Sequence, residues 1–159
     1  MMKRLVVPGL RLCSVAAPAQ TGGPELTLTA AESIANGCRT FASAKGQSHA
    51  IAIVDAGGHL ILAMRMDGNR EGVMAFAIEK AKAVAMWGFP TSGMAEAVKS
   101  TPGFAAAPYV VTVGGGVPVY GADGRTLIGA VGASGEAPAD DAACAAAGIK
   151  AAGLASLRK

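Results

Sequence analysis

Five ionisable residues in the middle of the chain have side chains suited to acid–base chemistry. Asp55 and His59 flank a Gly-Gly pair, Arg65 follows shortly after, and Glu79 and Lys80 are adjacent in an almost wholly apolar stretch. Burial beside apolar residues raises a carboxylate pKa toward neutrality, where Glu79 or Asp55 could move a proton, and His59 is a third acid–base candidate. Lys80 or Arg65 would hold a substrate carboxylate. We therefore interpret Glu79, Lys80, Asp55 and His59 as candidate catalytic residues and Arg65 as a candidate substrate-binding residue.

Three of these residues also have a structural interpretation. Asp55 enters a turn, where aspartate carboxylates commonly accept hydrogen bonds from backbone N–H groups. Glu79 and Lys80 could form a solvated charge pair, although charges in so apolar a helix more often face a cavity or a partner. The sharper hypothesis is that Asp55 and Arg65 line one pocket beside the following helix.

A glycine triplet supplies a second candidate element. Gly114, Gly115 and Gly116 could turn several N–H groups toward an anion and stabilise a developing oxyanion. No Gly-Lys-Ser/Thr follows the triplet, and the next element reads as a strand, so it fits neither a P-loop nor a dinucleotide fingerprint. A tight, ligand-free connection is an equally favoured interpretation. Ser134, at the end of the last predicted strand, is a further substrate-binding candidate.

The hydrophobic spacing predicts the elements that must position these residues. A helix should begin near residue 28, and Ala50 to Asp67 should form a hairpin around its Gly-Gly turn. A second helix is expected over 70–87, with Phe76 and Trp87 on its buried face, and a short helix over 91–98. Residues 109–113 read as a strand, residues 117–133 as a hairpin around an Asp-Gly turn, and Pro138 suits the start of a final helix.

This helix-strand-strand-helix-strand-strand-helix order predicts an α+β fold. Strands joined by tight turns are antiparallel neighbours, so we expect a single antiparallel sheet with helices packed on it. Residues 1–25, rich in proline and glycine, should form an N-terminal arm, and residues 26–157 a single domain.

Composition narrows the classes of partner. Only 16% of the residues are charged, and so few charges predict a homo-oligomer. The net charge of +3 is spread thinly, without a basic stripe, so nucleic acid is not an expected partner. No stretch is long enough to span a bilayer, and Pro8, Gly9 and Arg11 interrupt the N-terminal apolar run, so we expect a cytoplasmic protein with no membrane partner.

The cysteines predict neither a metal site nor a disulfide framework. Cys13, Cys38 and Cys144 are odd in number, far apart and without metal-ligand spacing. Reduced, mostly buried thiols are the expectation for such a chain.

Several short motifs occur in an order that resembles a known family. They are V-D-A-G-G-H-L at 54–60, R-M-D-G at 65–68, E-K-A at 79–81, G-G-G-V-P at 114–118, I-G-A-V-G-A-S-G at 128–135 and D-D-x-x-C-x-x-A-G at 140–148. Together they resemble the GlcG/HbpS-like family, also called the haem-degrading or DUF336 domain. The resemblance covers about residues 26–150. It implies a compact α+β subunit that assembles into dimers and often octamers, in a family with haem-binding and corrinoid-enzyme-associated members and with members encoded beside catabolic enzymes.

Three functions follow from the residues and the resemblance. The favoured one is a catabolic enzyme that acts on a small carboxylate without a cofactor. Its reaction would be an isomerisation or tautomerisation, a hydration (a lyase reaction) or a hydrolysis. The alternative is a haem- or corrinoid-binding module, with His59 or His49 as iron ligand. A non-catalytic accessory oligomer is the third. No cofactor is required by the first hypothesis, and haem is the cofactor of the second.

Overall fold

The structure, a computed structural model, describes residues 24–159. Helices and strands follow the order expected from the sequence. They are α1 (Leu28–Ala44), β1 (Ala50–Asp55), β2 (Leu60–Arg65), α2 (Glu71–Trp87), α3 (Thr91–Ser100), the 3-10 turn η1 (Phe104–Ala106), β3 (Gly116–Tyr120), β4 (Leu127–Ser134) and α4 (Pro138–Ala151). Nearly all of the expected arm, residues 1–25, lies outside the described residues, so the arm stays a prediction.

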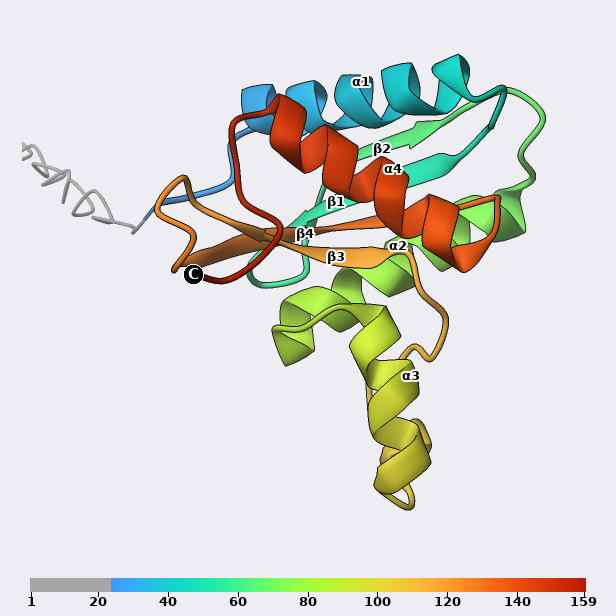
Figure 1. Cartoon of the computed structure of the whole chain (residues 1–159), viewed down its shortest axis with the longest axis vertical. Helices are drawn as coiled ribbons and strands as arrows, with labels where there is room; N and C mark the ends of the chain where they lie inside the picture. The colour runs from blue at the N-terminus through green and yellow to red at the C-terminus, as the bar shows by residue number, and fades with distance from the viewer. Residues whose placement is uncertain (1–23) are drawn as a thin grey trace, which may run out of the picture.

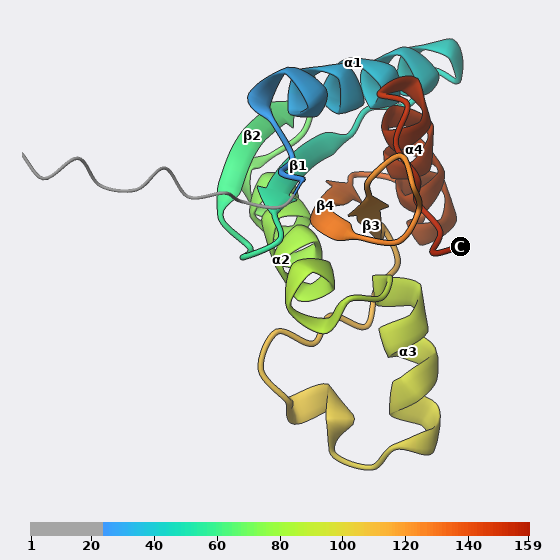
Figure 2. The same cartoon turned by 90° about the vertical axis from the view of Figure 1, so that its left-hand side faces the viewer.

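The four strands form one antiparallel sheet in the order β2-β1-β4-β3. Helices α1 and α4 cover one face of this sheet and α2 covers the other, while α3 projects away from the body (Figures 1 and 2). This arrangement confirms the predicted α+β fold.

The central strand β1 is buried on both faces, because each face of the sheet carries helices. Ile51 and Ile53 point into the core beneath α1 and α4. Ala50, Ala52 and Val54, at the alternate positions, pack against α2. This period-two alternation places the two alanines of β1 under α2 and its two isoleucines under α1 and α4.

The contact between α2 and β4 depends on a glycine. A Cβ atom at Gly132 would clash with the carbonyl oxygen of Ala77, so only glycine lets the helix lie this close to the strand.

The predicted buried face of α2 is wrong at two positions, since Phe76 and Trp87 are 36% and 40% exposed. Lys80 is buried on the sheet side of the same helix instead.

The strand expected over residues 109–113 is absent, and β3 begins at Gly116. The turn at 121–126 sets the register of β3 against β4, and this register pairs Gly116 with Gly132. The ladder ends with the hydrogen bond from Ala133 N to Gly115 O, and β4 itself ends at Ser134. Residues before Gly115 therefore have no strand to pair with, whatever their β propensity.

Cys38 on α1 and Cys144 on α4 form a disulfide. The expectation of reduced thiols is therefore wrong for these two residues. Sequence spacing could not reveal the pair, because the two cysteines are 106 positions apart and meet only when α1 packs on α4. Both cysteines are fully buried in the core.

Across residues 24–159, none of the helices combines the length and the apolar character that a membrane crossing requires.

Candidate functional site

Glu79 and Lys80 point in different directions from α2. The Lys80 side chain is 1% exposed and lies against the sheet. The Glu79 side chain is 54% exposed and forms an ion pair with Lys82 at 3.3 Å. Consecutive helical residues are about 100° apart around the axis, so the two side chains cannot share one face. The structure thus separates two residues that the sequence analysis grouped together.

Lys80 is part of a buried ionic network that spans three elements. Its Nζ atom donates to Asp141 Oδ2 and to the carbonyl oxygen of Ala133, each at 3.0 Å. His49 Nδ1 lies 3.0 Å from Asp141 Oδ1 and is the donor in this contact, because an ionised carboxylate only accepts. The backbone N–H of Glu136 donates to the same oxygen at 3.1 Å. The network joins α2, the end of β4 and the first turn of α4.

The partners of Asp141 keep its carboxylate ionised. Burial would raise the pKa of Asp141, but the hydrogen bonds from His49, Lys80 and the Glu136 N–H outweigh burial and lower this pKa below its ordinary value. With its charge committed to Asp141, Lys80 is held as a structural cation. Within the described residues, His49 Nε2 is buried without a hydrogen-bond partner.

The glycine triplet packs over this network and leaves no room beside Lys80. A Cβ atom at Gly115 would lie 2.8 Å from Lys80 Nζ and 2.9 Å from Asp141 Cβ. The N–H of Gly116 donates to Thr91 Oγ1 at 2.9 Å. Gly114 lies against Pro138 and lines an open cavity of about 430 Å³ between α3 and the start of α4. The triplet thus serves close packing at Gly115 and Gly116, and only Gly114 borders open space.

Asp55 and Arg65 lie at opposite ends of the β1–β2 hairpin. Arg65 pairs with Ala50 at the start of β1, whereas Asp55 ends that strand. The hypothesis that Asp55 and Arg65 line one pocket is therefore wrong. The Arg65 guanidinium donates to the backbone oxygen of Asn69. Ser134 pairs with Ala50 from the other side and is buried at the end of β4.

Asp55 and His59 form a paired unit at the hairpin turn. One carboxylate oxygen of Asp55 accepts from the N–H groups of Gly57 at 2.8 Å and His59 at 2.9 Å. The ring atom His59 Nδ1 lies 3.1 Å from the other oxygen, Asp55 Oδ2. Burial would raise the pKa of Asp55, but these hydrogen bonds together lower it, so the carboxylate is an acceptor and Nδ1 the donor. The 83% exposed imidazole therefore keeps the lone pair of Nε2 free for a ligand.

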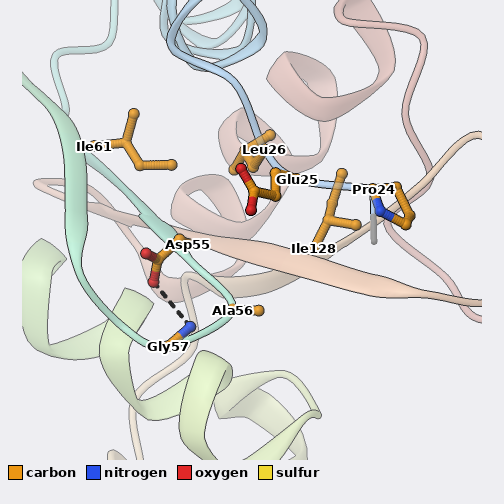
Figure 3. Close-up of a pocket in the computed structure, with 8 residues that line it drawn as sticks. All are labelled: Pro24, Glu25, Leu26, Asp55, Ala56, Gly57, Ile61 and Ile128. Atoms are coloured by element: carbon orange, nitrogen blue, oxygen red, sulfur yellow. Dashed lines mark hydrogen bonds between the residues drawn. The ribbon is translucent and has the colours of Figure 1, made fainter. Parts of the chain in front are cut away.

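Two cavities border the turn, one on each side, and Gly57 lines both. The larger, about 330 Å³, lies beneath the start of α1 and has apolar walls from Leu26, Ile61 and Ile128 (Figure 3). Its carboxylates, Asp55 and Glu25, come from the turn and from the segment before α1. This cavity suits an apolar group better than an anion.

The smaller cavity, about 150 Å³, lies where the turn meets the end of α2. Its wall contains Lys82, Met86 and Tyr109, and the Met86 methyl lies close to Gly58. Met86 and Tyr109 are 41% and 57% exposed, and Tyr109 has a φ of 61°, a strained conformation for a residue other than glycine. Sequence reasoning missed both residues, because nothing singled out Met86 within its apolar helix and Tyr109 read as part of a strand.

An antiparallel sheet with helices on both faces, together with the order of the motifs, defines a class of α+β proteins with known members. The family model described as "Haem degrading protein HbpS-like" matches residues 26–150, and the chain belongs to this family. Protein GlcG of Escherichia coli K12 is 40% identical over 88 residues, which are 55% of this chain and 64% of GlcG. The chain therefore spans just under two thirds of the curated relative that it matches.

Solved structures share the same fold. A double mutant of HbpS from Streptomyces reticuli superposes with a TM-score of 0.76 at 26% identity, over 90% of this chain and 97% of that chain. A complex of PduOC with haem gives a TM-score of 0.76 at 22% identity, over 85% of this chain and all of that chain. The ORFY protein of Klebsiella pneumoniae, a DUF336 protein, gives 0.75 at 24% identity, over 86% and 97% of the two chains. The last two likenesses concern the fold alone.

Proposed function

We propose that this protein binds haem and that His59 is the protein ligand of the iron. The observation that carries the proposal is the Asp55–His59 pair. A carboxylate on Nδ1 fixes the ring orientation and the tautomer of a metal-binding histidine and leaves Nε2 as the ligand atom. Support also comes from the family description and from the haem complex formed by a protein of the same fold.

The surroundings of the turn fit a partly exposed haem. Met86 and Tyr109 offer apolar surface beside the turn, together with a thioether and a phenol, which are side-chain types that ligate haem iron. Lys82, on the same wall, is a cation that could pair with a propionate. Haem bound here would supply a redox-active iron, while His59 holds it and Asp55 keeps the imidazole in the ligating orientation.

The predicted carboxylate-processing enzyme has weaker geometric support. Glu79 faces outward, Lys80 is enclosed with Asp141, and Arg65 lies at the far end of the hairpin from Asp55 and His59. These residues do not surround one cavity of the described chain. The acid–base set of the sequence analysis therefore remains a prediction without a shared cavity behind it.

We also propose that the subunit assembles with copies of itself, as the family resemblance implies. Leu60, Met86, Trp87 and Tyr109 leave large apolar surface exposed on the single chain. Light scattering coupled to size-exclusion chromatography would measure the subunit number, and a strictly monomeric mass would contradict assembly.

Haem titration followed at the Soret band tests the proposed ligand. The wild-type chain should give a saturable Soret shift, and His59→Ala should lose it. Asp55→Asn should weaken binding by about 10- to 100-fold, because the imidazole loses the carboxylate that orients it. Asp123→Asn is the matched control, since Asp123 accepts backbone N–H bonds in the other hairpin turn without a histidine partner.

An unchanged Soret spectrum in His59→Ala would overturn His59 as the ligand. Met86→Leu and Tyr109→Phe, tested in the same way, would then identify a thioether or phenolate ligand. A wild-type chain without any saturable Soret shift would overturn haem binding altogether.

A further inference from the structure

Two arginines from different elements line a single surface cavity of about 440 Å³. Arg39 comes from the second half of α1, and Arg65 is the last residue of β2. Nothing in the local sequence brings them together, because they meet only when α1 packs across the hairpin. The cavity volume is in the range of small-molecule sites.

In the part of the chain that the structure describes, neither guanidinium has a carboxylate partner. Within residues 24–159, no ion pair includes Arg39 or Arg65. Both are held instead by neutral acceptors: Arg39 donates to Asn36 Oδ1 at 3.2 Å, and Arg65 donates to the backbone oxygen of Asn69. These contacts position the two side chains, and neither of them places a carboxylate directly on a guanidinium. Two like charges at one cavity repel each other, and an anion between them would remove the repulsion.

The remaining wall supplies hydroxyl groups and apolar surface. Ser43 lies one helical turn after Arg39, on the same face of α1, and Ser48 follows in the next loop. The Ser48 hydroxyl is ordered, because it donates to the backbone oxygen of Asp67 at 2.6 Å and accepts from Asn69 Nδ2 at 2.8 Å. Met64 and Met66 form the apolar part of the wall.

Two carboxylates lie near the cavity and limit what it can bind. Asp67 lines the cavity, and Glu136 accepts from the Ser48 N–H at 3.0 Å. A singly charged anion would gain less from the arginines because of these negative groups. An oxyanion with two charges and several oxygen atoms can pair with both guanidinium groups, since carboxylate and phosphate oxygens both match the arginine fork.

We propose that this cavity binds a small doubly charged oxyanion, either a dicarboxylate or a phosphate group, between Arg39 and Arg65. The site goes beyond haem binding and is independent of it, since it uses none of the residues at the hairpin turn. It gives the chain a place for an acidic metabolite.

Calorimetric titration of the full chain with succinate and, separately, with inorganic phosphate at low ionic strength tests the proposal. At least one of the two anions should bind at one site per chain, and neutral succinamide should not bind. Arg39→Gln and Arg65→Gln should each weaken binding by about tenfold or more, the range expected for a lost charge-assisted hydrogen bond. Added salt should weaken it further.

Arg125→Gln is the matched control, because Arg125 is an exposed arginine in the β3–β4 turn, outside this cavity. The anion affinity of Arg125→Gln should equal that of the wild type. The anion affinity of His59→Ala should also be unchanged. The preferred anion identifies the ligand class. The proposal fails if neither anion gives a saturable heat, or if Arg125→Gln reduces binding as much as Arg39→Gln does. Haem binding should also be measured on Arg39→Gln. The haem proposal and the anion proposal can then fail independently of each other.

Discussion

Lys80 and Asp141 form a 3.0 Å ion pair in which the two side chains are 1% and 2% exposed. The pair attaches the first turn of α4 to α2, which lies on the opposite face of the sheet. His49 completes the contact from the loop before β1. Three segments far apart in sequence are therefore fixed by one carboxylate.

Asp141→Asn should lower the free energy of unfolding by about 3–5 kcal/mol, because it leaves the Lys80 charge buried without its partner. Urea unfolding at pH 7 measures the loss. Asp140→Asn is the control, because Asp140 forms only an exposed pair with Lys45 at 3.6 Å, and its loss should cost less than about 1 kcal/mol. Equal effects of the two substitutions would contradict a structural role for the buried pair.

The same pair should make stability depend on pH in the acid range. The pKa of Asp141 is lower in the folded chain than in the unfolded chain, so its contribution is fully present above about pH 4 and is lost as the pH falls through the folded-state pKa. Unfolding midpoints measured between neutral and acid pH should fall more steeply for the wild type than for Asp141→Asn. Parallel curves would rule out Asp141 as a source of the acid sensitivity.

Gly132→Ala should destabilise the fold by several times the effect of a surface substitution, because the added methyl group meets the Ala77 carbonyl oxygen and must push α2 off the sheet. Gly72, in the first turn of the same helix, is the comparison. Nothing lies within 4 Å of a Cβ atom placed there, so Gly72→Ala should stabilise the helix by up to about 1 kcal/mol. Thermal unfolding of the two variants should shift in opposite directions, and a neutral Gly132→Ala would show that the helix can move at no cost.

Thr91→Val should cost about 1–3 kcal/mol, because the buried N–H of Gly116 loses its acceptor while the shape of the side chain is kept. Thr91→Ser retains the hydroxyl and should be milder. Chemical denaturation of both variants separates the hydrogen bond from the packing. If serine and valine prove equally costly, the packing of the Thr91 methyl group contributes as much as its hydrogen bond, and the hydrogen bond is not the dominant interaction.

The sequence predicted the hairpins well because their signals are local. Gly-Gly and Asp-Gly turns between β-rich runs lie within a few residues of the strands that they join. The strand expected at 109–113 fails for the opposite reason. Its Val-Val-Thr-Val run has high β propensity, but pairing depends on how far β4 extends, which is not visible in that segment.

In the candidate site, too, the sequence identified a residue from its neighbours in the chain but not the residues that pair with it only in the fold. Lys80 was singled out because its neighbours are apolar, and it is indeed buried. Its partner Asp141 was missed, because an aspartate in the first turn of a helix is already explained by the helix dipole. Nothing in the sequence pointed to Arg39, because it is an exposed arginine on α1. It becomes a candidate binding residue only because the fold places it at the same cavity as Arg65.

The Cys38–Cys144 disulfide closes a covalent ring that contains all four strands. A protease that cuts the exposed backbone at 101–103 would open this ring at one point, yet both fragments would stay tethered through the two sulfur atoms. The nicked molecule would migrate as one species in electrophoresis without a reductant and as two after thiol treatment. The chain can therefore lose its continuity in the projecting α3 region and still remain a single covalent particle.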